Sequence, residues 1–461
     1  MNAPHTNIER RTACLASRIS QAGGDGRWLW DGVREVSIVS ALSETRLGGR
    51  RDALAGKTVL IRTRDQLSAA LVLIELDSVA KRLILAPPDL DAAHLPFVIE
   101  DGGVEVIVGD IPPTDDLGVE HVPLTDPAPR LRSSVAHRRS EWVMFTSGTT
   151  GRPKMVAHSL HGLTGAIPPA DPDDPPVWGT FYDVRRYGGL QMLLRALIGG
   201  GSMILSRPDE STGDFLARLG QRGVTHLSAT PSHWRKALMS PAIKAVAPRY
   251  LRLSGEIADQ AVLDNLKAMF PGTPVGHAYA STEAGVGFEV NDGLEGFPAD
   301  FIGRPGAVAM KVQDGSLRLR SFRTASQYVG AAADLAPDLA DGDGFVDTGD
   351  MVEQRGERFY FAGRRGGIIN VGGLKIHPEE VEAVINRHPA VRMSLVKGRK
   401  NPITGAIVVA EVVADGSDET LRDQILSDCR AVLPAFKVPT SIRFVDQLTV
   451  TAGGKLERRI A

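Results

Sequence analysis

The stretch FTSGTTGRPKMVAH, residues 145–158, concentrates hydroxyl side chains, two glycines and a lysine in one short segment. Glycine lets a backbone approach a ligand closely, and successive backbone N–H groups in such a turn form an anion-binding nest. The P-loop pattern G-x-x-x-x-G-K-[ST] does not fit, because Gly148 and Gly151 are three residues apart and Met155 follows Lys154. The stretch therefore predicts a phosphate-binding loop of another kind, with an ordinary polar surface turn as the alternative.

Strand patterns alternate with helical patterns on both sides of this loop. The predicted strands span 58–62, 82–86, 104–110, 223–230, 250–255 and 274–281, and the predicted helices span 65–81 and 260–270. This alternation is typical of βαβ units and predicts largely parallel sheets. Ligands bind beyond the carboxyl ends of such strands, so SGE (254–256) and YASTEAG (279–285) are candidate site segments.

The composition changes after residue 340. The glycine- and aspartate-rich segment DGDGFVDTGDM (341–351) is followed by GRRGGIINVGG (363–373). The rest of the chain predicts helix, strand, helix and strand at 378–388, 406–414, 421–433 and 441–448. We therefore place a boundary at 364–367, which leaves a C-terminal α+β module of residues 368–461.

The overall composition excludes several classes of protein. A formal net charge of −2 over 461 residues, 43% of them apolar, favours a globular protein without strong attraction to nucleic acid or anionic membranes. Two cysteines are too few for a disulfide framework or a cysteine-built zinc site, and the scattered histidines favour structural roles over metal binding. The N-terminus lacks the apolar core of a signal peptide, and no apolar stretch reaches the ~18 residues of a membrane span. We expect a cytoplasmic protein.

Five motifs occur in order from residue 145 to the C-terminus: FTSGTTGRPK (145–154), YASTEAG (279–285), VDTGD (346–350), GRRGGIINVGGLKIHPEEVE (363–382) and TAGGKLERR (451–459). Together they resemble the adenylate-forming superfamily of acyl- and aryl-CoA synthetases, peptide-synthetase adenylation domains and luciferases. The preceding region is shorter than usual in that family. The resemblance implies an α/β fold with a large N-terminal domain (1–363) of βαβ subdomains, parallel-type sheets and a small β-rich subdomain. A hinge (364–367) then joins it to a small mobile C-terminal α+β domain (368–461).

The resemblance also implies an activity. A carboxylate would attack the α-phosphate of ATP to give an acyl-adenylate and pyrophosphate, and a thiol would then take the acyl group. This makes the chain an ATP-dependent acid–thiol ligase with ATP, Mg²⁺ and, as probable co-substrate, CoA. A carrier-protein phosphopantetheine is the alternative acceptor. A catalytically inactive nucleotide-binding protein is the second alternative, which Lys455, Glu283 and Asp350 disfavour.

Site residues follow from the resemblance, motif by motif. In YASTEAG, Tyr279 would lie against adenine, Thr282 on the α-phosphate and Glu283 on Mg²⁺, whereas a helix start capped by Ser281 or Thr282 is the alternative. Lys455 would neutralise charge in the first half-reaction, although a lysine near a chain end is commonly a solvated charge. The remaining ATP-binding residues would be Thr146, Ser147, Gly148, Thr149, Thr150, Gly151, Lys154, Gly255, Glu256, Asp350 and Arg364.

The acid, the acceptor and the hinge have candidate residues as well. The acid pocket is expected to include Tyr182, Arg185, Arg186, Tyr187 and Ala278. The two arginines would pair with a polar or anionic group of the acid, and exposed charges are the alternative. Amino-acid substrates are disfavoured because Tyr187 stands where amino-acid-activating relatives have an aspartate. Gly366 would be the pivot, and Gly372 and Gly373 would border the CoA or carrier tunnel.

Overall fold

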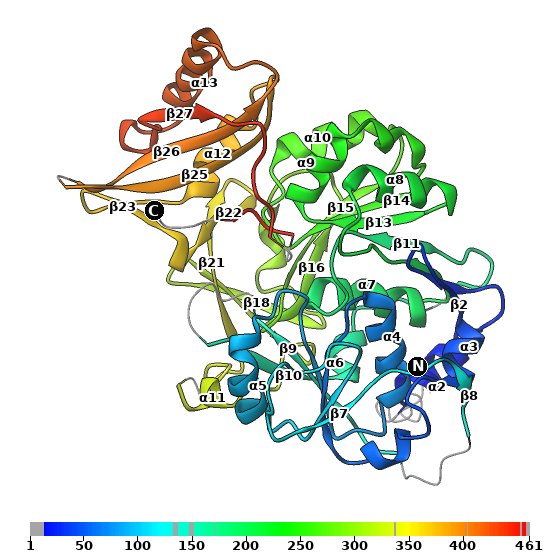
Figure 1. The fold of residues 1–461 in the computed structure, drawn as a ribbon. Coiled ribbons are helices and arrows are strands. Elements are labelled where there is room, and N and C mark those ends of the chain that lie inside the picture. Colours follow the sequence, from blue (N-terminus) through cyan, green and yellow to red (C-terminus); the bar gives the residue numbers. More distant parts are fainter. Residues whose placement is uncertain are drawn as a thin grey trace.

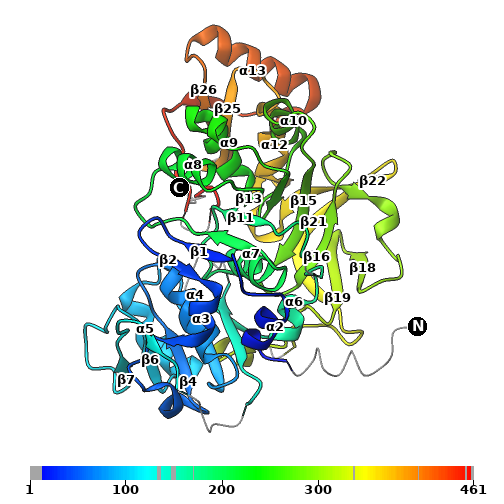
Figure 2. The same ribbon diagram turned by 90° about the vertical axis from the view of Figure 1, so that its right-hand side faces the viewer.

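The computed structural model describes residues 13–131, 137–146, 152–169, 171–335, 338–402, 404–451 and 454–457. A large N-terminal part is built on two large sheets and a smaller one, and a small C-terminal module lies on top of it (Figure 1). The same division is visible from the side (Figure 2). In the described part of the chain, no helix is long and apolar enough to cross a membrane.

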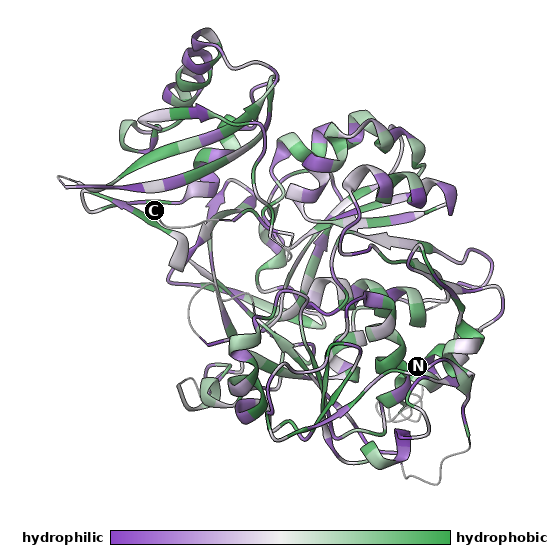
Figure 3. Cartoon of the chain, viewed as in Figure 1, coloured by the Kyte–Doolittle hydropathy of each residue, from purple (hydrophilic) through white to green (hydrophobic). Residues whose placement is uncertain are grey.

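The first large sheet carries the phosphate-loop motif. Its strand order is β20-β10-β9-β5-β4-β6-β7. Strands β9, β5, β4, β6 and β7 are parallel to one another, and β10 is antiparallel to both of its neighbours, β9 and β20. The strands are β4 (Thr58–Ile61), β5 (Arg82–Leu85), β6 (Val106–Val108), β7 (Glu120–Val122), β9 (Glu141–Phe145), β10 (Met155–Ser159) and β20 (Gln327–Val329). Helix α4 (Gln66–Leu76) crosses from β4 to β5 and is buried along its whole length, as its almost unbroken apolar sequence requires. Figure 3 shows it as a largely apolar helix.

The second large sheet carries YASTEAG. Its order is β16-β15-β14-β13-β11-β12-β1-β2, and the six strands between β16 and β2 are parallel. The strands are β1 (Trp28–Trp30), β2 (Glu35–Ser37), β11 (Val177–Thr180), β12 (Ser202–Ile204), β13 (His226–Ala229), β14 (Tyr250–Ser254), β15 (Val275–Ser281) and β16 (Gly285–Val290). The connecting helices are α7 (Tyr187–Ile198), α8 (Thr212–Gln221), α9 (Pro231–Met239) and α10 (Gln260–Met269). The predicted parallel α/β architecture is therefore confirmed.

A smaller antiparallel sheet completes the N-terminal part, in agreement with the expected β-rich subdomain. Its order is β17-β22-β21-β19-β18, with β17 (Phe297–Pro298), β18 (Val308–Gln313), β19 (Ser316–Ser321), β21 (Val346–Arg355) and β22 (Arg358–Arg364). The remaining elements are α2 (Leu15–Gln21), α3 (Ile38–Ser43), β3 (Glu44–Thr45), α5 (Leu95–Gly102), β8 (Ala128–Pro129), α6 (Leu160–Thr164) and α11 (Ala331–Leu335).

The C-terminal module has its own hydrophobic core. The β23 (Ile369–Val371) and β24 (Leu374–Ile376) hairpin is followed by α12 (Pro378–Ile385), β25 (Val391–Asn401), β26 (Gly405–Ala414), α13 (Glu419–Val432) and β27 (Ser441–Phe444). Ile376, Ile385, Val412 and Ile425 are fully buried in this core, which shares no residue with the N-terminal cores. One exposed 3-10 turn, Arg365–Gly367, connects β22 to β23. The predicted hinge at 364–367 falls on this connection, and its role as a pivot stays a prediction.

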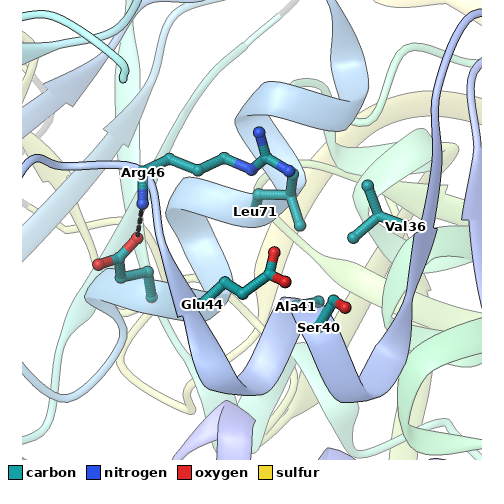
Figure 4. A pocket seen from close by; sticks show the side chains of 7 residues that line it. Val36, Ser40, Ala41, Glu44, Arg46 and Leu71 are labelled. Carbon is teal, nitrogen blue, oxygen red and sulfur yellow. Dashed lines mark hydrogen bonds between the residues drawn. The ribbon is translucent and has the colours of Figure 1, made fainter. Parts of the chain in front are cut away.

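A small cavity lies against α3 and α4, lined by Val36, Ser40, Ala41, Glu44, Arg46, Leu71 and Glu75 (Figure 4). The backbone N–H of Arg46 donates to Glu75 Oε2 beside it, at 3.2 Å. With a volume of about 10 Å³ it has room for one water molecule at most. None of the predicted site residues lines it.

Candidate active site

The YASTEAG segment forms a turn between two strands. Strand β15 continues to Ser281, and β16 begins at Gly285, so the alternative of a helix start at this point is wrong. Ser281 Oγ accepts a hydrogen bond from the Ala284 N–H at 2.9 Å, which closes the turn. Gly285 has φ +75°, and a Cβ there would lie 2.3 Å from the carbonyl oxygen of Arg323, so only glycine fits. The turn presents Thr282 and Glu283 at the sheet edge.

A buried histidine fixes the position of this turn. His158 lies on β10 and is 1% exposed, and its Nε2–H donates to the carbonyl oxygen of Thr282 at 2.8 Å. Burial lowers the pKa of His158 to about 4, partly opposed by that hydrogen bond. The contact connects the two large sheets at the predicted α-phosphate residue. No local pattern indicates this contact, since its two partners are 124 residues apart.

The residues predicted to contact the nucleoside meet at one carboxylate. Tyr279 donates its hydroxyl to Asp350 Oδ2 at 2.5 Å, and Arg364 Nε donates to Asp350 Oδ1 at 3.0 Å. Asp350 and Arg364 are cross-strand partners on β21 and β22, so sheet register places them together. The nearby carboxylate raises the pKa of the Arg364 guanidinium against the opposing effect of its burial. Each carboxylate oxygen retains a lone pair for a further donor.

Flat aromatic side chains surround Tyr279. The rings of Phe288 and Phe361 lie nearly parallel to it, with centroids 5.6 and 5.3 Å away. Burial, followed by the charge of Asp350, raises the pKa of the Tyr279 phenol well above its usual value. The phenol therefore remains a neutral hydrogen-bond donor at physiological pH.

The predicted phosphate loop connects two antiparallel neighbours, β9 and β10. Its ends meet where the Thr146 N–H donates to the Lys154 carbonyl oxygen at 2.9 Å, and Lys154 is exposed. Ser147, Gly148, Thr149, Thr150 and Gly151 lie outside the described residues.

Lys455 reaches this region from the C-terminal module. The chain after β27 leaves the module and runs down to the N-terminal part beside α9 (Figure 1, Figure 2). There, Thr451 and Lys455 close a tight hairpin, with the Thr451 N–H donating to the Lys455 carbonyl at 2.8 Å. Burial and the charge of Arg364 lower the pKa of Lys455, while Glu256, Asp350 and Glu283 act in the opposite direction. Residues from four separate motifs thus act electrostatically on one ammonium group.

The SGE segment lies at the end of β14, as predicted, but its glutamate is engaged within the protein. Glu256 Oε2 accepts the Ser232 N–H at 2.9 Å, and Oε1 accepts the Leu456 N–H at 3.1 Å. Gly255 adopts φ +88° and is exposed. The carboxylate that we expected to contact ATP therefore contacts the backbone of the Lys455 hairpin.

Three of the expected acid-pocket residues, Tyr182, Tyr187 and Ala278, are buried. The Tyr182 hydroxyl donates to the Ser254 carbonyl oxygen at 2.7 Å, at the end of β14. Tyr187 opens α7, and its ring lies 5.6 Å from that of His158. These side chains extend the site inward from the strand ends.

The two arginines expected in that pocket have different surroundings. Arg185 is 2% exposed, so the alternative of an exposed charge is wrong for it. Its guanidinium forms a two-point ion pair with Asp183 at 2.8 and 2.6 Å and also donates to the Thr63 carbonyl, which leaves little donor capacity for an acid. Arg186 is partly exposed and pairs with Asp89. Periodicity could not reveal the contacts to Thr63 and Asp89, because these residues are distant in sequence from the arginines.

The predicted hinge and tunnel glycines are exposed. A Cβ on Gly366 would meet no atom within 4 Å, and its φ lies outside the left-handed region. Gly372 and Gly373 form the tip of the β23–β24 hairpin with φ +57° and +87°, a combination that favours glycine at both positions.

A metal site built from protein ligands alone is not found in the described residues, in which no three His, Cys, Asp or Glu side chains cluster suitably. A Mg²⁺ ion is commonly held by one or two carboxylates together with substrate phosphates. Glu283, at the turn beside Thr282, fits that mode of binding. The ion would neutralise phosphate charge.

Comparison with known proteins agrees with this geometry. A family model described as AMP-binding enzyme matches residues 65–321, and one described as AMP-binding enzyme C-terminal domain matches residues 380–455. The chain is 27% identical over 422 residues to a probable CoA ligase, CCL9, of Humulus lupulus, covering 83% of this chain and 77% of that protein. It is 25% identical over 460 residues to the 2-succinylbenzoate–CoA ligase of Bacillus cereus (strain ATCC 10987 / NRS 248), covering 92% and 90%.

Solved structures share the fold. The anthranilate CoA ligase AuaEII in complex with anthranoyl-AMP superposes with a TM-score of 0.78 at 18% identity, over 97% of this chain and 96% of that one. ATP-bound MatB from Rhodopseudomonas palustris gives 0.78 at 20% identity, over 96% and 97%. The fold and the convergence of motifs define an adenylate-forming enzyme. The chain belongs to the AMP-binding enzyme family, and it is an AMP-forming acid–thiol ligase, as its motifs predicted.

Proposed function

We propose that this enzyme joins a small carboxylic acid to CoA in two half-reactions. In the first, a carboxylate oxygen attacks the α-phosphorus of ATP, the bond to the β-phosphate oxygen breaks, and pyrophosphate leaves. In the second, the CoA sulfur attacks the acyl carbon, its proton is lost, and AMP leaves. The observation that carries this proposal is the position of Lys455 within electrostatic reach of Arg364, Asp350, Glu256 and Glu283.

Each neighbour of Lys455 has a proposed task. Asp350 accepts hydrogen bonds from ribose hydroxyls, and Arg364 adds a ribose or phosphate contact. Thr282 donates a hydrogen bond to the α-phosphate. The phosphate loop, residues 146–154, holds the leaving pyrophosphate. The Lys455 ammonium neutralises charge that develops between two anions, which is the kind of preorganised electrostatic stabilisation that dominates many catalysed reactions.

The acceptor and the acid are proposed from the names of relatives and from the C-terminal hairpin. Several relatives are named as CoA ligases, which favours CoA over a carrier-protein phosphopantetheine. The glycine tip of the β23–β24 hairpin is the proposed border of the pantetheine tunnel. Aromatic acids are the first candidates, because relatives and structural neighbours are named for 2-succinylbenzoate and anthranilate.

The test is acid-dependent pyrophosphate release, measured with ATP, Mg²⁺ and a panel of aromatic, short acyl and dicarboxylic acids. Thioester formation is then followed after addition of CoA. Adenylation without acyl-CoA would favour a carrier protein, and binding of ATP without pyrophosphate release from any acid would indicate an inactive nucleotide-binding protein. Lys455→Ala should lose acyl-AMP formation by about 100-fold or more. It should still convert supplied acyl-AMP and CoA to thioester.

A further inference from the structure

The backbone on both sides of Lys455 is held by the N-terminal part. On one side, the Thr230 hydroxyl donates to the Gly454 carbonyl oxygen at 2.5 Å. On the other side, the Leu456 N–H donates to Glu256 Oε1 at 3.1 Å. Thr230 is fully buried, and Glu256 is fixed by the Ser232 N–H at the start of α9. Thr230 directly follows β13 and caps α9, and Glu256 follows the end of β14, so both anchors lie at strand ends of the second large sheet.

The fit at Gly454 is close. Gly454 is buried with φ +78°, and a Cβ added there would lie 2.4 Å from Cε1 of His233 and 2.8 Å from its Nδ1. His233 is itself confined, since its ring lies 5.4 Å from that of Phe181 and 6.4 Å from that of Tyr182. The hairpin can lie against the sheet only because this position has no side chain.

We propose that Glu256, Thr230 and the His233 ring form a receptor for the Lys455 hairpin, and that Glu256 is a positioning residue for adenylation. The inference rests on the proposed role of Lys455. The receptor holds the two residues that flank the lysine, so it fixes the origin of the side chain while leaving the ammonium directed at the reacting groups. It also defines the orientation of the C-terminal module in which the first half-reaction takes place.

The carboxylate of Glu256 suits this task. A charged acceptor forms stronger hydrogen bonds to N–H groups than a neutral one does, and its two oxygens connect one N–H of the core to one of the hairpin. Both bonds are made at the backbone, so they do not depend on the identity of Leu456. When the module rotates, Glu256 Oε1 loses a partner but becomes accessible to water, which limits the cost of release.

The first test compares the half-reactions of Glu256→Gln with those of the wild type. Glutamine keeps the shape but has one acceptor oxygen in place of two. We expect the rate constant of acyl-AMP formation to fall by about 10- to 100-fold, because a small misplacement of a catalytic group costs this much. Conversion of supplied acyl-AMP and CoA to thioester should be unchanged. An increase in KM for ATP with unchanged kcat would overturn the proposal and return Glu256 to the nucleotide site.

The second test places the obstacle on the hairpin, so that no residue of the N-terminal part is substituted. Gly454→Ala should clash with His233 and give the same loss of adenylation with thioester formation retained. Gly23→Ala is the matched control, because Gly23 has the same φ of +78° and an added Cβ there meets nothing within 4 Å. Equal loss of both half-reactions, or equal effects of both glycine substitutions, would overturn the proposal.

A third readout does not depend on activity. Amide hydrogen exchange in the peptide that contains Leu456 should be faster in Glu256→Gln and Gly454→Ala than in the wild type and in Gly23→Ala. Faster exchange in an enzyme that adenylates no acid would support the receptor while contradicting the proposed function. Unchanged exchange in both variants would overturn the receptor.

Discussion

The hydroxyl of Tyr279 donates a hydrogen bond of 2.5 Å to the carboxylate of Asp350, across 71 positions of sequence. The aromatic residue proposed to lie against adenine and the carboxylate proposed to bind ribose are therefore oriented together before a nucleotide arrives. Preorganisation of this kind lowers the conformational cost of binding.

The first prediction concerns this pair. Tyr279→Phe keeps the ring among Phe288 and Phe361 but removes the donor, so Arg364 alone then orients the Asp350 carboxylate. We expect KM for ATP to rise by about 10-fold, in line with the loss of a hydrogen bond to a charged group. Asp350→Asn should raise it further, since one of its acceptor oxygens is lost. Steady-state kinetics at saturating acid measures both, and an unchanged KM in Asp350→Asn would exclude ribose binding by this residue.

The second prediction is a pH dependence. Adenylation requires the Lys455 ammonium, whose pKa is lowered from its ordinary value by burial and by Arg364. The rate should therefore decline as pH rises through this lowered pKa, at a lower pH than for a free lysine. Bound phosphates raise the pKa again, so the alkaline limb should lie at higher pH in kcat than in kcat/KM. A pH profile of acyl-AMP formation tests this, with thioester formation from supplied acyl-AMP as the control.

The third prediction concerns acid stability. The folded-state pKa of His158 is about 4 against an ordinary value of 6.5, so the unfolded chain binds this proton first as the pH falls. The protonation of His158 should therefore lower the free energy of unfolding by about 3 kcal/mol as the pH falls from 6.5 to 4. His158→Gln retains a donor for Thr282 and should reduce that decline in urea titrations. If the unfolding free energy of His158→Gln fell as steeply with pH as that of the wild type, this role of His158 would be contradicted.

The fourth prediction separates two neighbouring arginines. Arg185→Ala leaves the largely enclosed Asp183 carboxylate, 11% exposed, without its guanidinium partner, so we expect a loss of about 3 kcal/mol in unfolding free energy. Arg186→Ala removes a partly exposed pair with Asp89 and should cost less than about 1 kcal/mol. Chemical denaturation measures both. A stable Arg185→Ala protein with weakened acid binding would restore the pocket role expected from the sequence.

The fifth prediction concerns Gly366. The turn Arg365–Gly367 is a 3-10 turn, and proline has a compatible φ of about −65°. Gly366→Pro should therefore favour the present orientation, with Lys455 at the site, and retain acid-dependent pyrophosphate release while losing thioester synthesis. Gly366→Ala is the control, because its Cβ meets no atom within 4 Å. Thioester synthesis at the wild-type rate in the proline variant would place the pivot elsewhere.

Local pattern predicted much of the fold. The apolar run of α4 and the β-branched strands β4 and β5 each specify their conformation within a few residues, and the structure confirms them. Strand β25 was not predicted, because VRMSLVKGRKN mixes charged and apolar residues and becomes a strand by pairing with β26. Tertiary pairing, which a local pattern does not contain, decided that segment.

In the candidate site, too, local motifs could be read from the sequence, whereas long-range contacts could not. Motif order identified the residues around Asp350, since each motif carries its chemistry locally. Arg185 contacts Thr63, Arg186 contacts Asp89 and Glu256 contacts Leu456, and the two members of each pair lie far apart in sequence. Such long-range hydrogen bonds appear only once the chain is folded.

Arg364 has one further consequence. It is the last residue of β22, it donates to Asp350, and the exposed turn Arg365–Gly367, which we propose as the hinge, begins at the next residue. A rotation of the C-terminal module about this turn would therefore displace the side chain of Arg364, which we propose contacts the nucleotide. Thermodynamic linkage then makes the effect reciprocal: an orientation that binds AMP less tightly is disfavoured by AMP through the same factor. Release of AMP and the return of the C-terminal module to its adenylation orientation would then be thermodynamically coupled.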